Sequence, residues 1–148
     1  MTDTKVLIVD DEPENIRYLR FILEENGFQQ IRSAGNGEEG WEILQEFIPG
    51  LLVLDLRMPK KSGIHLFNQI KQNWKFKSIP TIILTGESEF LKHLEALRSF
   101  HEGREPDTEK PPEAIFEHFV AARPEAFLEK PIEPEAFMEA VRTVLSKP

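Results

Sequence analysis

The sequence predicts an α/β fold in which helices cover both faces of one parallel sheet. Short apolar runs alternate with segments of helical periodicity, which is the pattern of β-α-β units. The third and fourth apolar runs are almost continuously apolar, as strands covered on both faces are. At 148 residues the chain has the size of a single domain, which we expect to span residues 1–148.

Five apolar runs are expected to form the strands of this sheet. They are residues 6–9, 31–34, 51–54, 79–84 and 126–129. The alternation of strands and helices is complete only if the last of these runs is a strand.

Helical periodicity predicts five helices that follow these strands. In the first, Ile16, Leu19, Ile22 and Leu23 form one apolar stripe, Pro13 suits an early helical position, and Gly27 suits the end. The other four stripes are Trp41, Leu44 and Ile48; Ile64, Phe67 and Ile70; Phe90, Leu94, Leu97 and Phe100; and Phe137, Val141, Val144 and Leu145.

The region between the fourth and fifth strands is longer than one helix and two loops require. Residues 101–112 are polar and contain one glycine and three prolines, which indicates a loop. Ile115, Phe116, Phe119 and Val120 then form a further apolar stripe after a proline pair suited to a helix start. We therefore predict an insertion, a loop and an extra helix, at about residues 101–122. Its apolar stripe could pack on the domain or serve as a partner or dimer surface.

Composition restricts the classes of function. The formal net charge of −8 argues against nucleic acid or an anionic membrane as the main partner. The lysines beside Trp74 and Phe76 (Lys71, Lys75 and Lys77) are therefore interpreted as a solvated helix end.

The chain has no cysteine, which excludes disulfides and thiolate metal sites, and its four histidines show no ligand spacing. With no secretory signal and no apolar run near the ~18 residues that span a bilayer, a cytoplasmic protein is expected.

Polar residues stand where four of the predicted strands end. Asp10 and Asp11 follow the first strand, Asp55 the third, Thr85 the fourth and Lys130 the fifth. The carboxyl ends of parallel strands meet at one edge, where ligands bind in open α/β sheets. We therefore expect these five side chains to converge.

The converging carboxylates predict a magnesium site. Two carboxylates in close contact repel by roughly 4 kcal/mol at an effective dielectric constant of ~20, and a divalent cation would relieve this. Because all the candidate ligands are hard oxygens, Mg²⁺ is favoured. Lys130 would supply a cation for a second anionic oxygen and Thr85 a hydroxyl donor. A central aspartate is the group best placed to act as a nucleophile and form an acyl phosphate.

At these positions the sequence resembles the receiver domain of two-component response regulators. The motifs that carry the resemblance are residues 9–12 (Val-Asp-Asp-Glu), 55–59 (Asp-Leu-Arg-Met-Pro), 85–86 (Thr-Gly) and 127–131 (Phe-Leu-Glu-Lys-Pro). The resemblance covers the whole chain except for roughly residues 101–121. The resemblance implies a flavodoxin-like doubly wound sheet with strand order 2-1-3-4-5.

The resemblance also implies a role for each site residue. Asp55 would accept the phosphoryl group, and Asp10, Asp11, Asp55 and the backbone carbonyl of Arg57 would hold Mg²⁺. Thr85 and Lys130 would contact the phosphoryl group, Thr85 and Phe127 would form the switch, and Pro131 would follow a cis peptide bond. Arg57 is also expected to tune the lifetime of the phosphoryl group.

The implied function is acceptance of a phosphoryl group from a histidine kinase or histidine phosphotransfer protein. Phosphorylation would change a surface formed by the fourth helix, fifth strand and fifth helix, which would bind a downstream protein, an effector domain or a second copy of the chain. Such a module is no enzyme beyond its own phosphorylation and dephosphorylation. Few residues follow the last predicted helix, so either a stand-alone receiver or a fragment of a longer regulator is expected.

Two alternatives remain open from the sequence. A phosphatase of the haloacid dehalogenase type also forms an aspartyl phosphate. Such an enzyme usually has a second aspartate two positions after its nucleophile, and two positions after Asp10 this chain has Glu12. The chain also lacks the length for a typical cap domain. A scaffold with a silent site, in which the insertion alone binds partners, is the other alternative, and the intact set of five site residues argues against it.

Overall fold

The computed structural model describes residues 2–56, 63–85 and 124–146. Its five strands are β1 (Thr2–Val9), β2 (Phe28–Ala34), β3 (Leu51–Asp55), β4 (Thr81–Thr85) and β5 (Ala126–Glu129). They form one sheet of order β2-β1-β3-β4-β5 in which every neighbouring pair is parallel. The predicted fold class and strand order are therefore confirmed.

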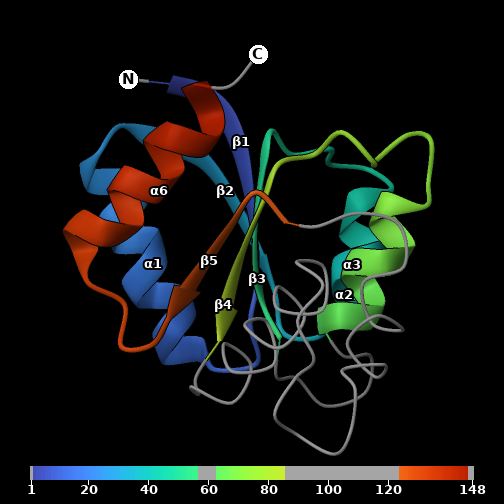
Figure 1. Cartoon of the computed structure of the whole chain (residues 1–148), viewed down its shortest axis with the longest axis horizontal. Helices are drawn as coiled ribbons and strands as arrows, with labels where there is room; N and C mark the ends of the chain where they lie inside the picture. Colours follow the sequence, from blue (N-terminus) through green and yellow to red (C-terminus); the bar gives the residue numbers. More distant parts are fainter. Residues whose placement is uncertain (1, 57–62, 86–123, 147–148) are drawn as a thin grey trace, which may run out of the picture.

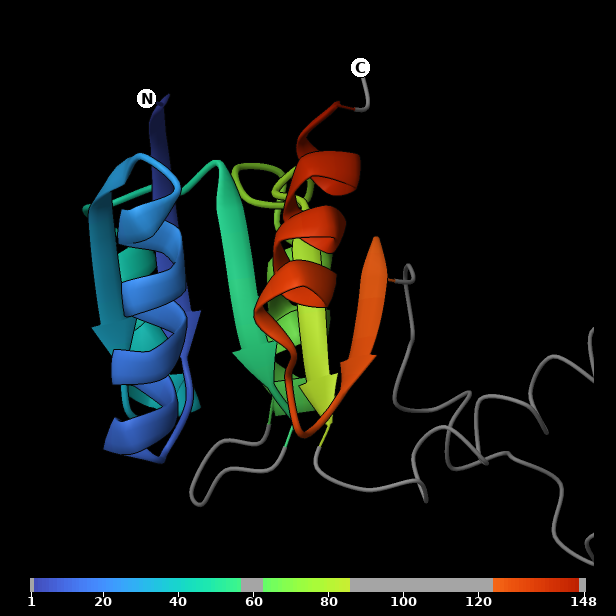
Figure 2. The ribbon, with the colours of Figure 1, turned by 90° about the vertical axis from the view of Figure 1, so that its left-hand side faces the viewer.

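The helices lie in two layers, one on each face of the sheet. In Figures 1 and 2, α1 (Pro13–Glu25) and α6 (Pro134–Ser146) cover one face, and α2 (Gly37–Leu44) and α3 (Gly63–Lys71) cover the other. All five arrowheads point to the same edge of the sheet (Figure 2). This edge collects the residues that follow the strands.

The sheet separates two apolar cores because successive side chains of a strand point to opposite faces. In β1, Val6 and Ile8 belong to the core under α1 and α6, whereas Leu7 and Val9 belong to the core under α2 and α3. Every residue of β3 and β4 is buried, as the continuous apolar runs predicted. The central strands therefore hold their carboxyl ends in a rigid frame.

Several predicted boundaries differ from the structure. The second helix ends at Leu44 and leaves Ile48 52% exposed in the following loop, because a residue before a proline, here Pro49, disfavours helical geometry. Strand β2 begins three residues earlier than predicted, at Phe28, and β4 begins at Thr81, after Pro80.

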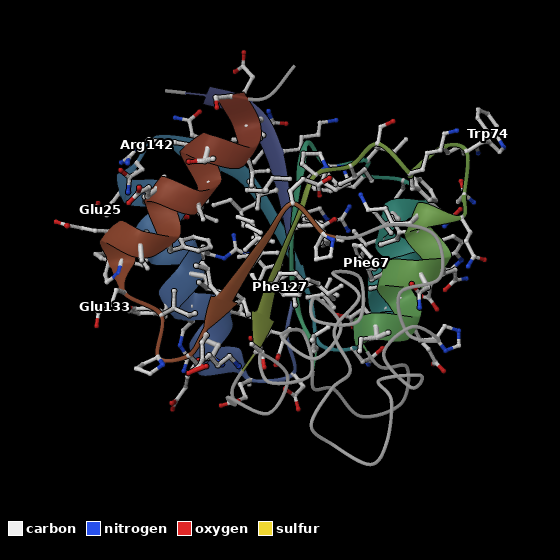
Figure 3. The ribbon with its side chains drawn as sticks, viewed as in Figure 1. Glu25, Phe67, Trp74, Phe127, Glu133 and Arg142 are labelled. Carbon is white, nitrogen blue, oxygen red and sulfur yellow. The ribbon has the colours of Figure 1, made fainter. Side chains whose placement is uncertain are left out.

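The interpretation of the lysines near Trp74 as a solvated helix end is wrong for Lys71. This side chain is buried, and its Nζ donates to the carbonyl oxygens of Ile79 at 2.8 Å and Lys77 at 3.3 Å. Trp74 is 78% exposed, with Lys75 Nζ 5.8 Å from its ring centroid. It projects away from the carboxyl edge of the sheet (Figure 3).

The predicted fourth helix, around residues 90–100, and the predicted insertion at residues 101–122 lie outside the described residues. Within the described ranges, no helix has the length and apolar character needed to cross a membrane.

Candidate functional site

The first part of the site is the turn between β1 and α1. Asp10 is fully buried, and its backbone N–H donates to the Ala34 carbonyl oxygen at 3.0 Å, which extends the β1–β2 pairing by one residue. One carboxylate oxygen, Oδ1, accepts a 2.9 Å hydrogen bond from the Glu12 backbone N–H. The next residue, Asp11, is exposed. The turn thus presents one buried and one solvated carboxylate.

Asp55 and Lys130 form the second part of the site. Asp55 is the last residue of β3 and is 2% exposed. Lys130 directly follows β5, and its backbone N–H donates to the Thr85 carbonyl oxygen at 2.8 Å. Lys130 Nζ lies 3.4 Å from Asp55 Oδ2 and 3.8 Å from Asp10 Oδ2. One ammonium group therefore faces two buried carboxylates.

The electrostatics of the site favour an additional cation. Each of Asp10, Asp11 and Asp55 offers a carboxylate oxygen, and these oxygens lie within 4.8 Å of one another. Burial raises the pKa of the Asp10 carboxyl above its usual value, although the Glu12 amide and the Lys130 charge oppose this. Three acids and one lysine leave an excess of negative charge in a partly buried pocket.

The residues of the pocket fit a magnesium ion. Asp10 Oδ2 is buried and has no hydrogen-bond partner among the described residues, which is costly unless a cation or water binds it. The donor set consists of carboxylate oxygens, which are the ligands that Mg²⁺ prefers. Arg57, whose carbonyl was predicted as a further ligand, lies outside the described residues.

Thr85 and Phe127 lie where the sequence placed them, on neighbouring strands. Thr85 is the last residue of β4 and is 3% exposed, and it is in register with Glu129, next to Lys130. Phe127 is half-buried and packs against the core under α2 and α3. This core includes Phe67 of α3, which is labelled with Phe127 in Figure 3. The Lys130–Pro131 peptide bond is cis, the isomer that the resemblance implies.

Sequence reasoning missed Gly63, which supports the end of β3. Its N–H donates to the Leu56 carbonyl oxygen at 3.2 Å. A Cβ atom at this position would overlap the Asp55 carbonyl oxygen and lie 2.7 Å from Leu56 Cα. Only glycine therefore lets the start of α3 approach the backbone of Asp55 so closely. The one available signal was a glycine directly before a predicted helix.

The fold and the pocket define a class of protein: a parallel α/β module with an acidic cluster and a lysine at the carboxyl edge of its sheet. The response regulator receiver domain matches residues 6–101 of the sequence, and the chain belongs to this family.

Similar proteins include several response regulators. The chain is 25% identical over 142 residues to Response regulator Rre1 of Synechocystis, covering 96% of this chain and 52% of that protein. It is 40% identical over 85 residues to the probable chemotaxis protein CheY of Rhizobium etli, covering 57% and 66% respectively. A probable cyclic di-GMP phosphodiesterase of Vibrio cholerae is 39% identical over 88 residues, covering 60% of this chain and 20% of that protein. The chain thus spans between 20% and 66% of the length of these relatives.

Solved structures agree with the fold. The signal receiver domain of a histidine kinase from Syntrophus aciditrophicus has a TM-score of 0.72 at 25% identity, with 97% of this chain and 90% of that chain covered. A putative response regulator from Chloroflexus aurantiacus has a TM-score of 0.76 at 22% identity, with 99% and 100% covered.

Proposed function

We propose that this chain accepts a phosphoryl group on Asp55 in a Mg²⁺-dependent reaction. The observation that carries the proposal is the position of Asp55: its buried Oδ2 lies 3.4 Å from Lys130 Nζ, and its carboxylate lies within 4.8 Å of those of Asp10 and Asp11. Membership in the receiver family supports the same assignment.

The donor in this proposal is a phosphohistidine on a histidine kinase or a histidine phosphotransfer protein. A carboxylate oxygen of Asp55 attacks the phosphorus atom, the P–N bond breaks, and the imidazole leaves with the electron pair of that bond. Lys130 would neutralise one phosphoryl oxygen, and Thr85 would donate its hydroxyl hydrogen to another. Asp10, Asp11 and Asp55, with the Arg57 carbonyl, would hold Mg²⁺. Bound there, the ion would offset charge on the transferring group.

The output of the proposed reaction is a shift between two conformations. Thr85 would move toward the phosphoryl group and Phe127 would turn inward, which would change the surface near β5. In the described sheet β5 is an edge strand, so such a change would reach the molecular surface. The proposed reader of this surface is a downstream protein, an effector domain or a second copy of the chain. Neither nucleic acid nor a membrane is proposed as a direct partner.

We also propose that residues 1–148 form one receiver domain with an insertion at about residues 101–122, and that it works in the cytoplasm. Catalysis is confined to phosphorylation and dephosphorylation of the chain itself. Steady turnover of a phosphate ester would instead indicate a phosphatase.

The proposal is tested by intact mass after incubation with acetyl phosphate and Mg²⁺. The unmodified sequence should gain the mass of one phosphoryl group, and Asp55→Asn should gain none. Asp3→Asn, the same substitution at an exposed position on β1, serves as the matched control and should still be labelled. Labelling of Asp55→Asn at the same rate would remove Asp55 as the acceptor.

A further inference from the structure

Tyr18 connects helix α1 to the loop that carries Lys130. It lies in the second turn of α1, and its hydroxyl donates a 2.7 Å hydrogen bond to the carbonyl oxygen of Ile132. Ile132 stands two residues after Lys130, between the end of β5 and the start of α6. The two groups are 114 residues apart in the sequence. This contact is not part of the acidic pocket itself.

The loop after β5 is incompletely packed where Tyr18 spans it. A cleft of about 210 Å³ lies there, and its lining includes Tyr18, Leu19, Lys130 and Pro131. Close packing normally fixes a side chain in place, so an open space beside Lys130 leaves more of that task to hydrogen bonds. Pro131 has no N–H to donate.

Among the described residues, three contacts hold the loop after β5. The Lys130 N–H donates to the Thr85 carbonyl oxygen at 2.8 Å, the Ile132 side chain packs against the core under α1 and α6, and Tyr18 holds the Ile132 carbonyl oxygen. The first acts before the cis bond and the other two after it. The Tyr18 contact adds a hydrogen bond between the loop and the helix that begins beside Asp10 and Asp11.

We infer that Tyr18 is a positioning residue for Lys130, because its hydroxyl holds the loop so that Nζ stays beside the buried oxygens of Asp10 and Asp55. Tyr18 touches neither carboxylate and acts only through the loop. The inference rests on the proposed function, since the role of Lys130 in phosphoryl transfer belongs to that proposal. The carboxylates that would hold the metal stand at the ends of β1 and β3, so replacing Tyr18 should change metal affinity less than it changes the rate of phosphorylation.

The test replaces Tyr18 by phenylalanine, which keeps the ring and removes only the donor. Phosphorylation by acetyl phosphate at fixed Mg²⁺ should slow about two- to tenfold, the range expected for loss of one hydrogen bond, here a solvent-exposed one. The dissociation constant for Mg²⁺, measured by titration, should stay within about twofold. Arg20→Met is the matched control, because Arg20 also lies on α1 and donates to a backbone carbonyl, that of Ile31 at 3.1 Å.

A second readout does not depend on phosphorylation. In protein labelled with ¹³C at the lysine ε-carbon, the Lys130 signal is assigned by its disappearance in Lys130→Arg. Tyr18→Phe should shift this signal and leave those of Lys5 and Lys71 in place.

The inference would be overturned if Tyr18→Phe left the Lys130 signal unchanged. It would also be overturned if the unmodified sequence is phosphorylated and Tyr18→Phe is phosphorylated at the same rate. Equal slowing in Arg20→Met would overturn it as well. If the unmodified sequence does not label at all, the proposed function fails, and the Lys130 signal alone decides whether Tyr18 positions this lysine.

Discussion

Replacing Asp10 by asparagine should stabilise the metal-free protein and abolish its response to Mg²⁺. Asp10 is fully buried, its Oδ2 has no hydrogen-bond partner among the described residues, and an amide of the same shape can still accept from the Glu12 N–H through its oxygen. The substitution removes one negative charge and little else.

The magnitude follows from the distances. At an effective dielectric constant of ~20, Asp10 and Asp55 repel by about 3.5 kcal/mol at the 4.8 Å limit, and Asp10 attracts Lys130 by about 4.4 kcal/mol at 3.8 Å. These two nearly cancel. The repulsion from Asp11, weakened by solvent, and the cost of burying a charge remain, so the amide should be favoured by about 1–3 kcal/mol.

The assay is thermal unfolding followed by circular dichroism, first in EDTA and then in Mg²⁺. In EDTA the Tm of Asp10→Asn should rise by about 2–4 °C per kcal/mol gained. Mg²⁺ at a hundredfold excess over its Kd should stabilise the unmodified sequence by about 2.7 kcal/mol and the variant hardly at all. Asp3→Asn should show neither effect. A variant that is less stable in EDTA, or that still gains the full Mg²⁺ increment, refutes the reasoning.

Three further substitutions test other parts of the structure. Gly63→Ala should lower the free energy of unfolding by about 1–3 kcal/mol, because the added methyl overpacks against the β3 backbone. Gly35→Ala is the control, because its added methyl meets nothing within 4 Å. Urea unfolding measures both variants. Burial lowers the pKa of Lys71 in the folded protein. Between this lowered pKa and the usual lysine pKa, the unfolded chain binds more protons than the folded one. The free energy of unfolding should therefore rise with pH in this range. Unfolding between pH 7 and 10 should show this rise, Lys71→Met should lose it, exposed Lys75→Met should keep it, and a curve unchanged by Lys71→Met would contradict it. Arg57→Ala should change the autodephosphorylation rate; equal rates would remove its predicted role.

The strands and the acidic residues could be predicted because their signals are local. A continuous apolar run that ends in acids, as residues 6–11 do, fixes both a buried strand and the polar group at its end. The end of α2 was predicted wrongly because Ile48 continues the helical spacing while Pro49 opposes it. Helical spacing alone does not show which effect is stronger.

Contacts between distant segments could not be predicted in the same way. Nothing near Tyr18 indicates that its hydroxyl meets the carbonyl oxygen of Ile132. Lys71 looked like one of several solvated lysines, but the chain turns back so that two carbonyl oxygens and Glu125, 3.8 Å away, enclose its ammonium group. Gly63 likewise owes its importance to the backbone of β3, which packs against it.

The site therefore has two halves that are held by different means. Asp10 and Asp55 stand at the ends of buried strands, which resist displacement because both faces are closely packed. Lys130 stands on a loop beside an open cleft. The loop is held by the hydrogen bond from the Lys130 N–H to Thr85, the hydrogen bond from Tyr18 to the Ile132 carbonyl oxygen, and the packing of the Ile132 side chain. Substitutions in the strands should alter metal binding and phosphorylation together. Those at the loop should alter phosphorylation more than metal binding, so measuring both quantities on each variant separates the two halves.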